Sequence, residues 1–168
     1  DFTPSHLEIS NLYLNQYREY VKALSHLSKV EEIVAKLDEE ERRGVLERTY
    51  LEFGDIWRDR LDQQDLSKSR AYYSKTLRLN PKSFQAVFRM GLLEMDLNPQ
   101  KSIDLMLQAT KINSSFAGPY RNLGYLYKQI DNCPLALRYF RGYLDLSPKA
   151  GDSPEVRNEV LVLESSCG

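Results

Sequence analysis

The side chains that could carry acid–base, metal or nucleophilic chemistry are few in this sequence and are not grouped. Its two histidines are His6 and His26, 20 residues apart in the chain. There is no glycine-rich phosphate loop, no His-Glu-x-x-His pair and no Gly-x-Ser-x-Gly nucleophile elbow. The acidic run Glu39–Glu41 is expected in the first turn of a helix, where the helix dipole favours acids. We therefore expect no catalytic centre, no cofactor and no metal site, and a protein that is not an enzyme.

The two cysteines, Cys133 and Cys167, are predicted to have no special chemistry. Their number and spacing fit neither a disulfide framework nor a metal-binding motif. Cys133 lies in Asn132-Cys133-Pro134, where a packed turn residue is expected. Nothing nearby in sequence would lower the pKa of its thiol. The cysteines therefore leave the redox compartment open.

Charge and hydropathy exclude two classes of partner. The chain of 168 residues has a net charge of −1, with 23 basic and 24 acidic side chains. Neither nucleic acid nor an anionic membrane surface is expected to attract it. No apolar run approaches the roughly 20 residues that a membrane span requires.

The chain opens with Asp1 rather than Met, so we expect a processed form or a piece of a longer protein.

The periodicity of apolar residues is helical from the beginning of the chain. No glycine or proline occurs between Ser5 and Arg43. Apolar residues recur there at helical spacing, at Leu14, Tyr17, Val21, Leu24, Leu27, Val30, Val34 and Leu37. Ser5 with Glu8, and Asp38 with Glu41, have the capping-box pattern of a helix start. The sequence predicts one or two helices with a break near Leu37 and Asp38.

A repeat of about 34 residues dominates the rest of the chain. Gly54, Gly91 and Gly124 each follow a large apolar residue. Further on, a small residue precedes a large one by four positions, in the pairs Ser69 and Tyr73, Ser102 and Met106, and Ala136 and Phe140. The units close with Leu79-Asn80-Pro81, Ile112-Asn113-Ser114 and Leu146-Ser147-Pro148. A helical glycine costs about 1 kcal/mol against alanine. We therefore expect a second helix to cross where a Cβ would clash, with the small residue as the other half of that contact.

These residues resemble the tetratricopeptide repeat, which has an aromatic, Leu-Gly and Tyr on its first helix and Ala, Phe and Pro on its second. The third unit matches throughout, at Tyr120, Leu123, Gly124, Tyr127, Ala136, Phe140 and Pro148. The first unit has extra residues in its inner turn, and in the second Glu94 replaces the tyrosine. The resemblance covers about residues 47–150. It implies an all-α, TPR-type helical-repeat solenoid of antiparallel helix pairs in a right-handed superhelix.

The resemblance divides the chain into three parts. These are an N-terminal helical region at 1–46, repeats at 47–83, 84–116 and 117–150, and a C-terminal capping helix at 151–168. In the last part we expect Ser153 as N-cap and a buried stripe of Val156, Val160 and Leu163. The N-terminal helices either cap the array, which we favour, or pair two chains through Leu14, Tyr17, Val21 and Leu24. A monomer is therefore favoured and a homodimer possible.

In this family the first helices line the concave face, and helical periodicity indicates which residues point there. The predicted partner-binding residues are Arg48, Leu51, Asp55 and Arg58 in the first unit, Gln85, Phe88, Leu92 and Met95 in the second, and Arg121, Tyr125 and Lys128 in the third. An apolar floor with basic rims suits a peptide or helical segment that brings an apolar anchor and some negative charge. The alternative is that the N-terminal helices cover Phe88 and Leu92.

The sequence thus predicts a protein-interaction scaffold with a protein or peptide partner. Two alternatives stay open: a secretion-chaperone-like repeat protein that shields an apolar client segment, and a docking domain of a larger protein. The carboxylate clamp of heat-shock co-chaperones is rejected, because the matching positions are Leu51, Asp55, Arg89, Gly118 and Asn122. The segment 140–163 resembles the end of many bacterial repeat proteins. The compartment, bacterial cytoplasm or periplasm, is not determined.

Overall fold

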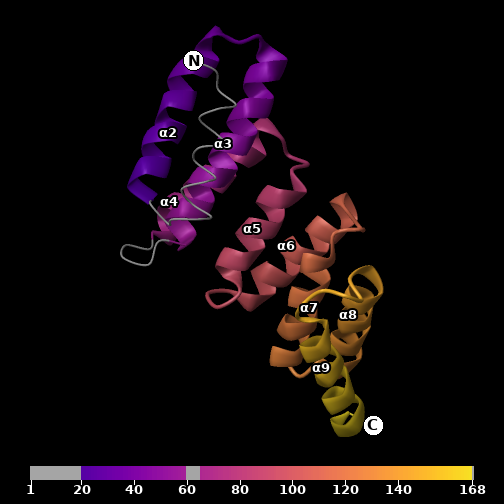
Figure 1. Cartoon of the computed structure of the whole chain (residues 1–168). Helices are drawn as coiled ribbons and strands as arrows, with labels where there is room; N and C mark the ends of the chain where they lie inside the picture. The colour runs from indigo at the N-terminus through magenta and orange to yellow at the C-terminus, as the bar shows by residue number, and fades with distance from the viewer. Residues whose placement is uncertain (1–19, 60–64, 168) are drawn as a thin grey trace. The chain divides into compact units, whose positions relative to one another are not determined.

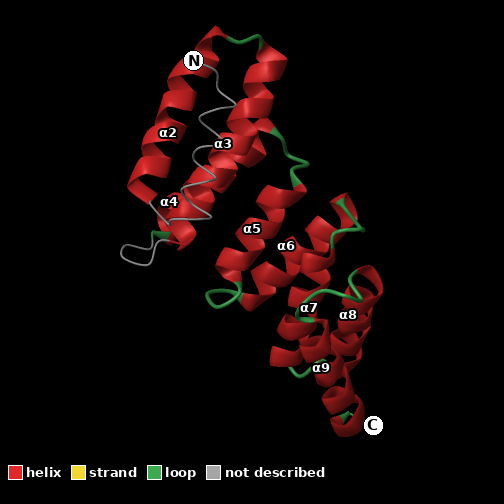
Figure 2. Ribbon diagram, viewed as in Figure 1, coloured by secondary structure: helices red, strands yellow, loops and turns green. Residues whose placement is uncertain are grey.

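The computed structural model describes residues 20–59 and 65–167, and the regular structure in these ranges is helical (Figure 2). The α-helices (Figure 1) are α2 Tyr20–Ile33, α3 Glu39–Asp59, α4 Leu66–Leu79, α5 Phe84–Glu94, α6 Pro99–Ile112, α7 Ala117–Gln129, α8 Cys133–Leu146 and α9 Ser153–Ser166. A 3-10 turn, Val34–Lys36, follows α2 at the predicted break. The all-α prediction is confirmed. The predicted helix start at Ser5, with Leu14 and Tyr17, lies outside the described residues.

Local capping explains where most helices begin and end. The Asp38 carboxylate accepts the backbone N–H of Glu41 at 2.9 Å, which starts the long α3 where the sequence predicts it. Side chains of Asp65, Asn98 and Asn132 cap α4, α6 and α8 in the same way. The start of α9 differs from the prediction by one residue: Asp152, and not Ser153, is the N-cap. Ser153 instead donates its hydroxyl to the carbonyl oxygen of Ser147 at 2.6 Å.

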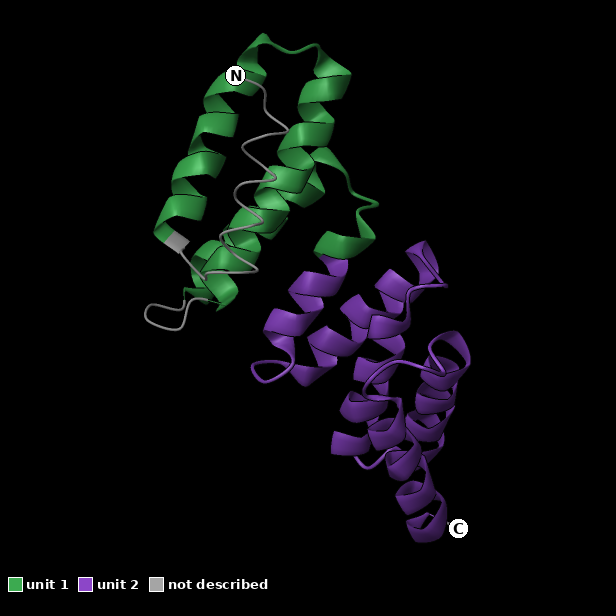
Figure 3. Cartoon of the chain, in the orientation of Figure 1, with its two compact units in different colours: residues 1–86 green, residues 87–168 purple. Residues whose placement is uncertain are grey.

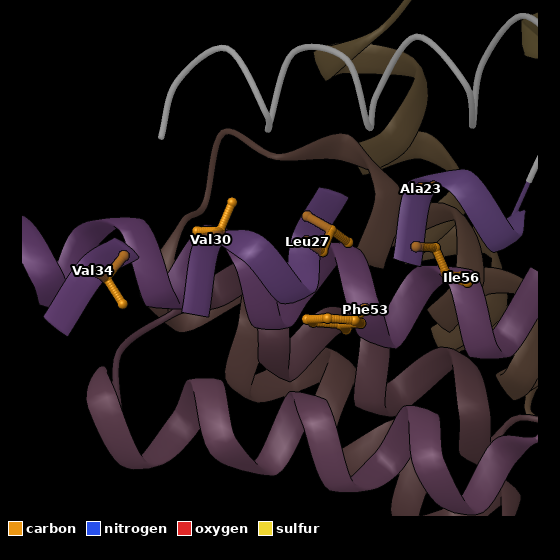
Figure 4. Packing of buried hydrophobic residues seen from close by; sticks show 6 residues of the cluster. All are labelled: Ala23, Leu27, Val30, Val34, Phe53 and Ile56. Atoms are coloured by element: carbon orange, nitrogen blue, oxygen red, sulfur yellow. The ribbon is translucent and has the colours of Figure 1, made fainter. Parts of the chain in front are cut away.

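The chain forms two compact units, residues 1–86 and 87–168, and the boundary falls within α5 (Figure 3). In unit 1, α2 packs on α3 through a cluster in which every member is nearly or fully buried (Figure 4): Ala23, Leu27, Val30, Val34, Phe53 and Ile56. Val21 is 75% exposed, because it lies on a different side of α2 from the buried Ala23 and Leu27. The assignment of this region as a cap or a dimerisation element stays a prediction.

Unit 2 contains two apolar clusters. One joins Ile103 and Met106 of α6 to Leu123 and Leu126 of α7. The other joins α8 to α9 through Ala136, Phe140, Tyr143, Val156, Val160 and Leu163. The predicted stripe on α9 is therefore buried, as expected.

Glu94, which replaces the repeat's tyrosine, is almost completely buried in unit 2. Its carboxylate lies 2.8 Å from the ammonium of Lys101. A buried charge is tolerated where it is paired. The ion pair therefore takes the position that an aromatic ring occupies in the first and third repeats, at Trp57 and Tyr127.

The repeated glycines lie where a Cβ would meet the second helix. A Cβ on Gly124 would be 2.5 Å from Cε1 of Phe140, and one on Gly54 would be 2.5 Å from Cδ1 of Tyr73. The predicted close approach is therefore present, and the atoms nearest to the added Cβ belong to the large residue. In the second repeat the small residue also contacts its glycine, because the Ser102 hydroxyl donates to the carbonyl oxygen of Gly91 at 2.8 Å. The small residues Ser69, Ser102 and Ala136 are fully buried.

Cys133 and Cys167 form a disulfide, with their Cα atoms 6.2 Å apart. Their number and spacing did not indicate a disulfide, and on this point the sequence prediction is wrong. Cys133 is also the first residue of α8 rather than a turn residue. Packing of α9 on α8 brings together two residues that are 34 positions apart in the chain, a proximity that their spacing alone does not indicate.

Candidate protein-binding surface

Two of the predicted contact residues in unit 1, Asp55 and Arg58, hold α3 to α4. The hydroxyl of the buried Tyr73 donates to Oδ1 of Asp55 at 2.6 Å, and the guanidinium of Arg58 lies 3.3 Å from the same oxygen. Burial, and next the Asp55 carboxylate, raise the pKa of Tyr73, so its hydroxyl stays a donor. Asp55 and Arg58 therefore stabilise a helix pair, and only their partly exposed sides are open to a partner.

The other predicted residues of unit 1 differ in exposure. Leu51 is buried, with 9% of its surface exposed, so it offers little area to a partner. Arg48 is exposed and its Nε lies 3.5 Å from a carboxylate oxygen of Glu52. Gln85 is exposed near the start of α5. Their participation in binding stays a prediction.

The three apolar residues predicted at this surface in unit 2 are half-buried and rest on the core. Phe88 and Leu92 lie on α5, and Met95 lies in the turn directly after it. Phe88, Leu92 and Met95 pack against the cluster of α6 and α7. The Phe88 ring meets Phe116 edge to face, with centroids 5.0 Å apart. A Cβ on Gly118 would be only 3.0 Å from Cζ of Phe88. The predicted apolar floor is thus an edge of the core, held rigidly from beneath.

Tyr125 of α7 is half-buried, and its ring meets Phe140 edge to face with centroids 4.9 Å apart. Burial raises the pKa of its hydroxyl, and the carboxylates of Glu155 and Glu159 raise it further. The surroundings of Tyr125 are therefore more acidic than the sequence indicates.

The two cations predicted at the rim of unit 2 are paired with carboxylates of the chain itself. Arg121 donates to Asp152, and Lys128 Nζ lies 2.5 Å from Oε2 of Glu159. The two cations are seven residues apart in the chain, and so are the two carboxylates. The two ion pairs therefore align α7 with α9. Asp152 also accepts the hydroxyl of Tyr143; this hydrogen bond, and next that from Arg121, lower the pKa of Asp152. The predicted basic rim is therefore balanced by acids in this unit.

Sequence reasoning missed three features of α9 because it gave that helix a capping role alone. The first is the acidic pair Asp152 and Glu159, whose seven-residue spacing matches that of the α7 cations and could have indicated the ladder. The second is Glu155, which is exposed and, among the described residues, has no cation within salt-bridge distance. The third is Leu161, which is 64% exposed. Of these residues, Asp152 and Glu159 form ion pairs with α7.

A further hollow lies in unit 1 between the first turns of α3 and the end of α4. Its volume is about 560 Å³, and its lining is largely charged or polar: Glu40, Arg43, Gly44, Glu47, Leu79, Asn80, Pro81 and Lys82. The Asn80 amide donates to the Glu47 carboxylate at 3.1 Å. Within residues 20–59 and 65–167, no three acidic, histidine or cysteine side chains gather as a metal site would require. In the same ranges no helix has the length and hydropathy to cross a membrane.

Comparison with solved structures shows which fold these helix pairs form. A crystal structure of MamA protein superposes with a TM-score of 0.65 and 17% identity, over 97% of this chain and 88% of that chain. PilF of Pseudomonas aeruginosa superposes with a TM-score of 0.71 and 17% identity, over 96% of this chain and 67% of that one. Both are tetratricopeptide-repeat proteins. This chain has the tetratricopeptide-repeat fold.

The TPR resemblance read from the residues is therefore confirmed. A MamA fragment from Desulfovibrio magneticus RS-1, residue 41 to the end, agrees, with a TM-score of 0.63 and 16% identity over 98% of this chain and 96% of that chain. No protein-family model and no curated protein sequence matches the chain.

Proposed function

We propose that this TPR protein binds an extended or helical segment of a partner protein along α5 and α7 of unit 2. The observation that carries the proposal is the row of Phe88, Leu92 and Met95. Phe88 and Leu92 lie on α5 and Met95 lies in the turn directly after it. All three side chains are half-exposed and are supported from beneath by the core. Apolar surface that a folded protein leaves open in one row is typical of a binding site.

Rigid support makes this row suited to recognition. Phe88 is held by Phe116 and by the close approach of Gly118, so it loses little side-chain freedom when a partner covers it. Tyr125 continues the surface on α7 and adds a hydroxyl to an apolar ring. Aromatic anchors of this kind carry a large share of the energy in protein interfaces.

Charge has a smaller role in the proposal than the sequence predicts. Arg121 and Lys128 can bind acidic groups of a partner only if they release Asp152 and Glu159. Each of these cations keeps 40% of its side chain exposed, and ion pairs of this exposure contribute little net energy. The apolar anchor is therefore the main determinant of affinity, and the charges act on orientation and rate. Arg48, Leu51, Asp55, Arg58 and Gln85 lie in unit 1, and their part in binding is a separate prediction from sequence periodicity.

The test begins with position-specific photocrosslinking in the native cell extract. A photoreactive phenylalanine analogue replaces Met95 in one variant and the exposed Gln108 of α6 in the control. We expect a partner protein to crosslink at Met95 and not at Gln108. Equal crosslinking at both positions would contradict a site on α5.

A second measurement uses the captured partner. Phe88→Ala is expected to weaken binding about thirtyfold, equivalent to about 2 kcal/mol, with affinity expressed per folded molecule. Ile130→Ala is the control, because Ile130 is an exposed apolar residue at the end of α7 outside the proposed row. If Phe88→Ala binds as tightly as the control, Phe88 acts in the core alone and the proposed surface is wrong.

A further inference from the structure

The two ends of α9 are fastened in different ways. At its start, Asp152 accepts hydrogen bonds from Tyr143 and Arg121. The buried Ser153 donates to the carbonyl oxygen of Ser147 at 2.6 Å. These are non-covalent contacts to two different helices and to the preceding turn, and they do not depend on the oxidation state of the protein.

The far end of α9 is held by the disulfide and by apolar contacts of Val160 and Leu163 with α8. An ion pair there joins Arg141 to Glu164 at 2.6 Å, with 59% and 42% of these side chains exposed, and such pairs contribute little. Leu163 and Val160 pack on α8, but the neighbouring Leu161 and Val162 face solvent. Without the covalent bond, the last turns of α9 would be attached by one apolar edge.

The disulfide is open to chemical exchange. Cys167 is exposed and Cys133 is half-buried, so a thiolate can approach the bond from the side of Cys167. A structural disulfide enclosed in a core would be protected from such attack. The site therefore combines a covalent restraint with access for a reductant.

We propose that Cys133 and Cys167 are a reversible redox pair that latches the C-terminal half of α9, with Asp152 and Ser153 as the hinge. A dithiol reductant attacks one sulfur, the S–S bond breaks, and the pair takes up two electrons and two protons to give two thiols. The reductant leaves as its own disulfide. In an oxidising compartment the pair stays closed, and α9 is held along its whole length.

Opening the latch changes the surface next to α7. Glu159 is the residue directly before the released half of α9, so its ion pair with Lys128 weakens and Lys128 becomes more available to another acid. Release of Val160 and Leu163 also uncovers the apolar side of α8. The effect on a partner rests on the proposed function, whereas the latch itself does not.

The experiment combines thiol labelling with hydrogen exchange on the intact chain. N-ethylmaleimide, with mass spectrometry, is expected to label neither cysteine before reduction and both after treatment with dithiothreitol. Amide exchange in residues 160–166 is expected to accelerate about tenfold on reduction, while exchange in residues 153–157 changes less than about twofold. The control is the double variant Cys133→Ser with Cys167→Ser. Its amide exchange should resemble that of the reduced chain and should not change when dithiothreitol is added.

Two outcomes would overturn the latch. Labelling of both cysteines in the air-oxidised protein before reduction would show that the pair does not form. Equal acceleration at the two ends of α9, or none at either end, would show that the disulfide does not hold one half of the helix selectively. Neither result depends on a partner, so failure of the latch is distinguishable from failure of the proposed binding surface.

Discussion

Replacing Gly124 with alanine should destabilise unit 2 although alanine is the better helix former. The added Cβ would lie 2.5 Å from Cε1 of Phe140. The Phe140 ring is fully buried and is held on another side by Tyr125. It cannot swing away, so α7 and α8 must separate by several tenths of an ångström.

Two opposing terms set the magnitude. Overpacking of a filled core costs about 1–3 kcal/mol, and removal of a helical glycine gains about 0.5–1 kcal/mol. The expected net loss is about 1–2 kcal/mol, which for a chain of this size lowers the melting temperature by about 3–6 °C. Gly124→Leu adds more atoms at the same place and should cost at least as much.

Two other glycines provide matched controls in helices. Nothing lies within 4 Å of a Cβ on Gly44, so Gly44→Ala should stabilise unit 1 by about 0.5–1 kcal/mol. A Cβ on Gly91 would meet the end of Met106 at 2.8 Å, and a flexible thioether can move aside. Gly91→Ala should therefore change stability by less than about 0.5 kcal/mol.

The assay is urea denaturation followed by circular dichroism, with each variant compared with the parent chain. From most to least stable, the expected order is Gly44→Ala, Gly91→Ala and Gly124→Ala. If Gly124→Ala is as stable as Gly44→Ala, α7 and α8 do not approach at Gly124, and the packing reason for the repeated glycine is wrong.

Three further predictions concern polar groups. Asp152 has a lowered pKa from the Tyr143 hydroxyl and Arg121, so its carboxylate stabilises the fold above its unfolded pKa and this contribution is lost as pH falls through the folded pKa. The stability gap between the parent chain and Asp152→Asn, measured by urea denaturation, should be constant above about pH 5 and should narrow as the pH falls below the unfolded pKa of about 3.9. Tyr73→Phe should cost about 1 kcal/mol in the same assay, because Asp55 loses a hydrogen bond. Arg121→Glu should slow association with the captured partner and reduce its salt dependence in stopped-flow measurements.

Each of these has a result that contradicts it. A gap for Asp152→Asn that stays constant down to pH 2 would mean that the carboxylate is not the stabilising group. Unchanged stability of Tyr73→Phe would mean that water replaces the hydroxyl at Asp55 without loss. Arg121→Glu also sets a second carboxylate beside Asp152, so Arg121→Gln is measured in parallel; an effect confined to the glutamate would indicate disruption of α9 and not steering.

The sequence alone determined the helices and their packing positions. Capping is a contact between a side chain and a backbone only three residues away, which is why Asp38 marks the start of α3 from the sequence. Periodicity likewise places Val156, Val160 and Leu163 on one buried stripe. A glycine at the same place in every unit indicates a close helix crossing without reference to the particular neighbour.

Only the tertiary structure decided which distant side chains meet. A disulfide requires two Cβ atoms about 4 Å apart, and Cys133 reaches Cys167 only because α9 packs along α8. The partners of Arg121 and Lys128 depend equally on the register of α9 against α7. The sequence predicted that these two cations form an open rim, whereas in the structure a neighbouring segment pairs with them. Ion pairs form between neighbours in space, and periodicity along one helix cannot identify such neighbours.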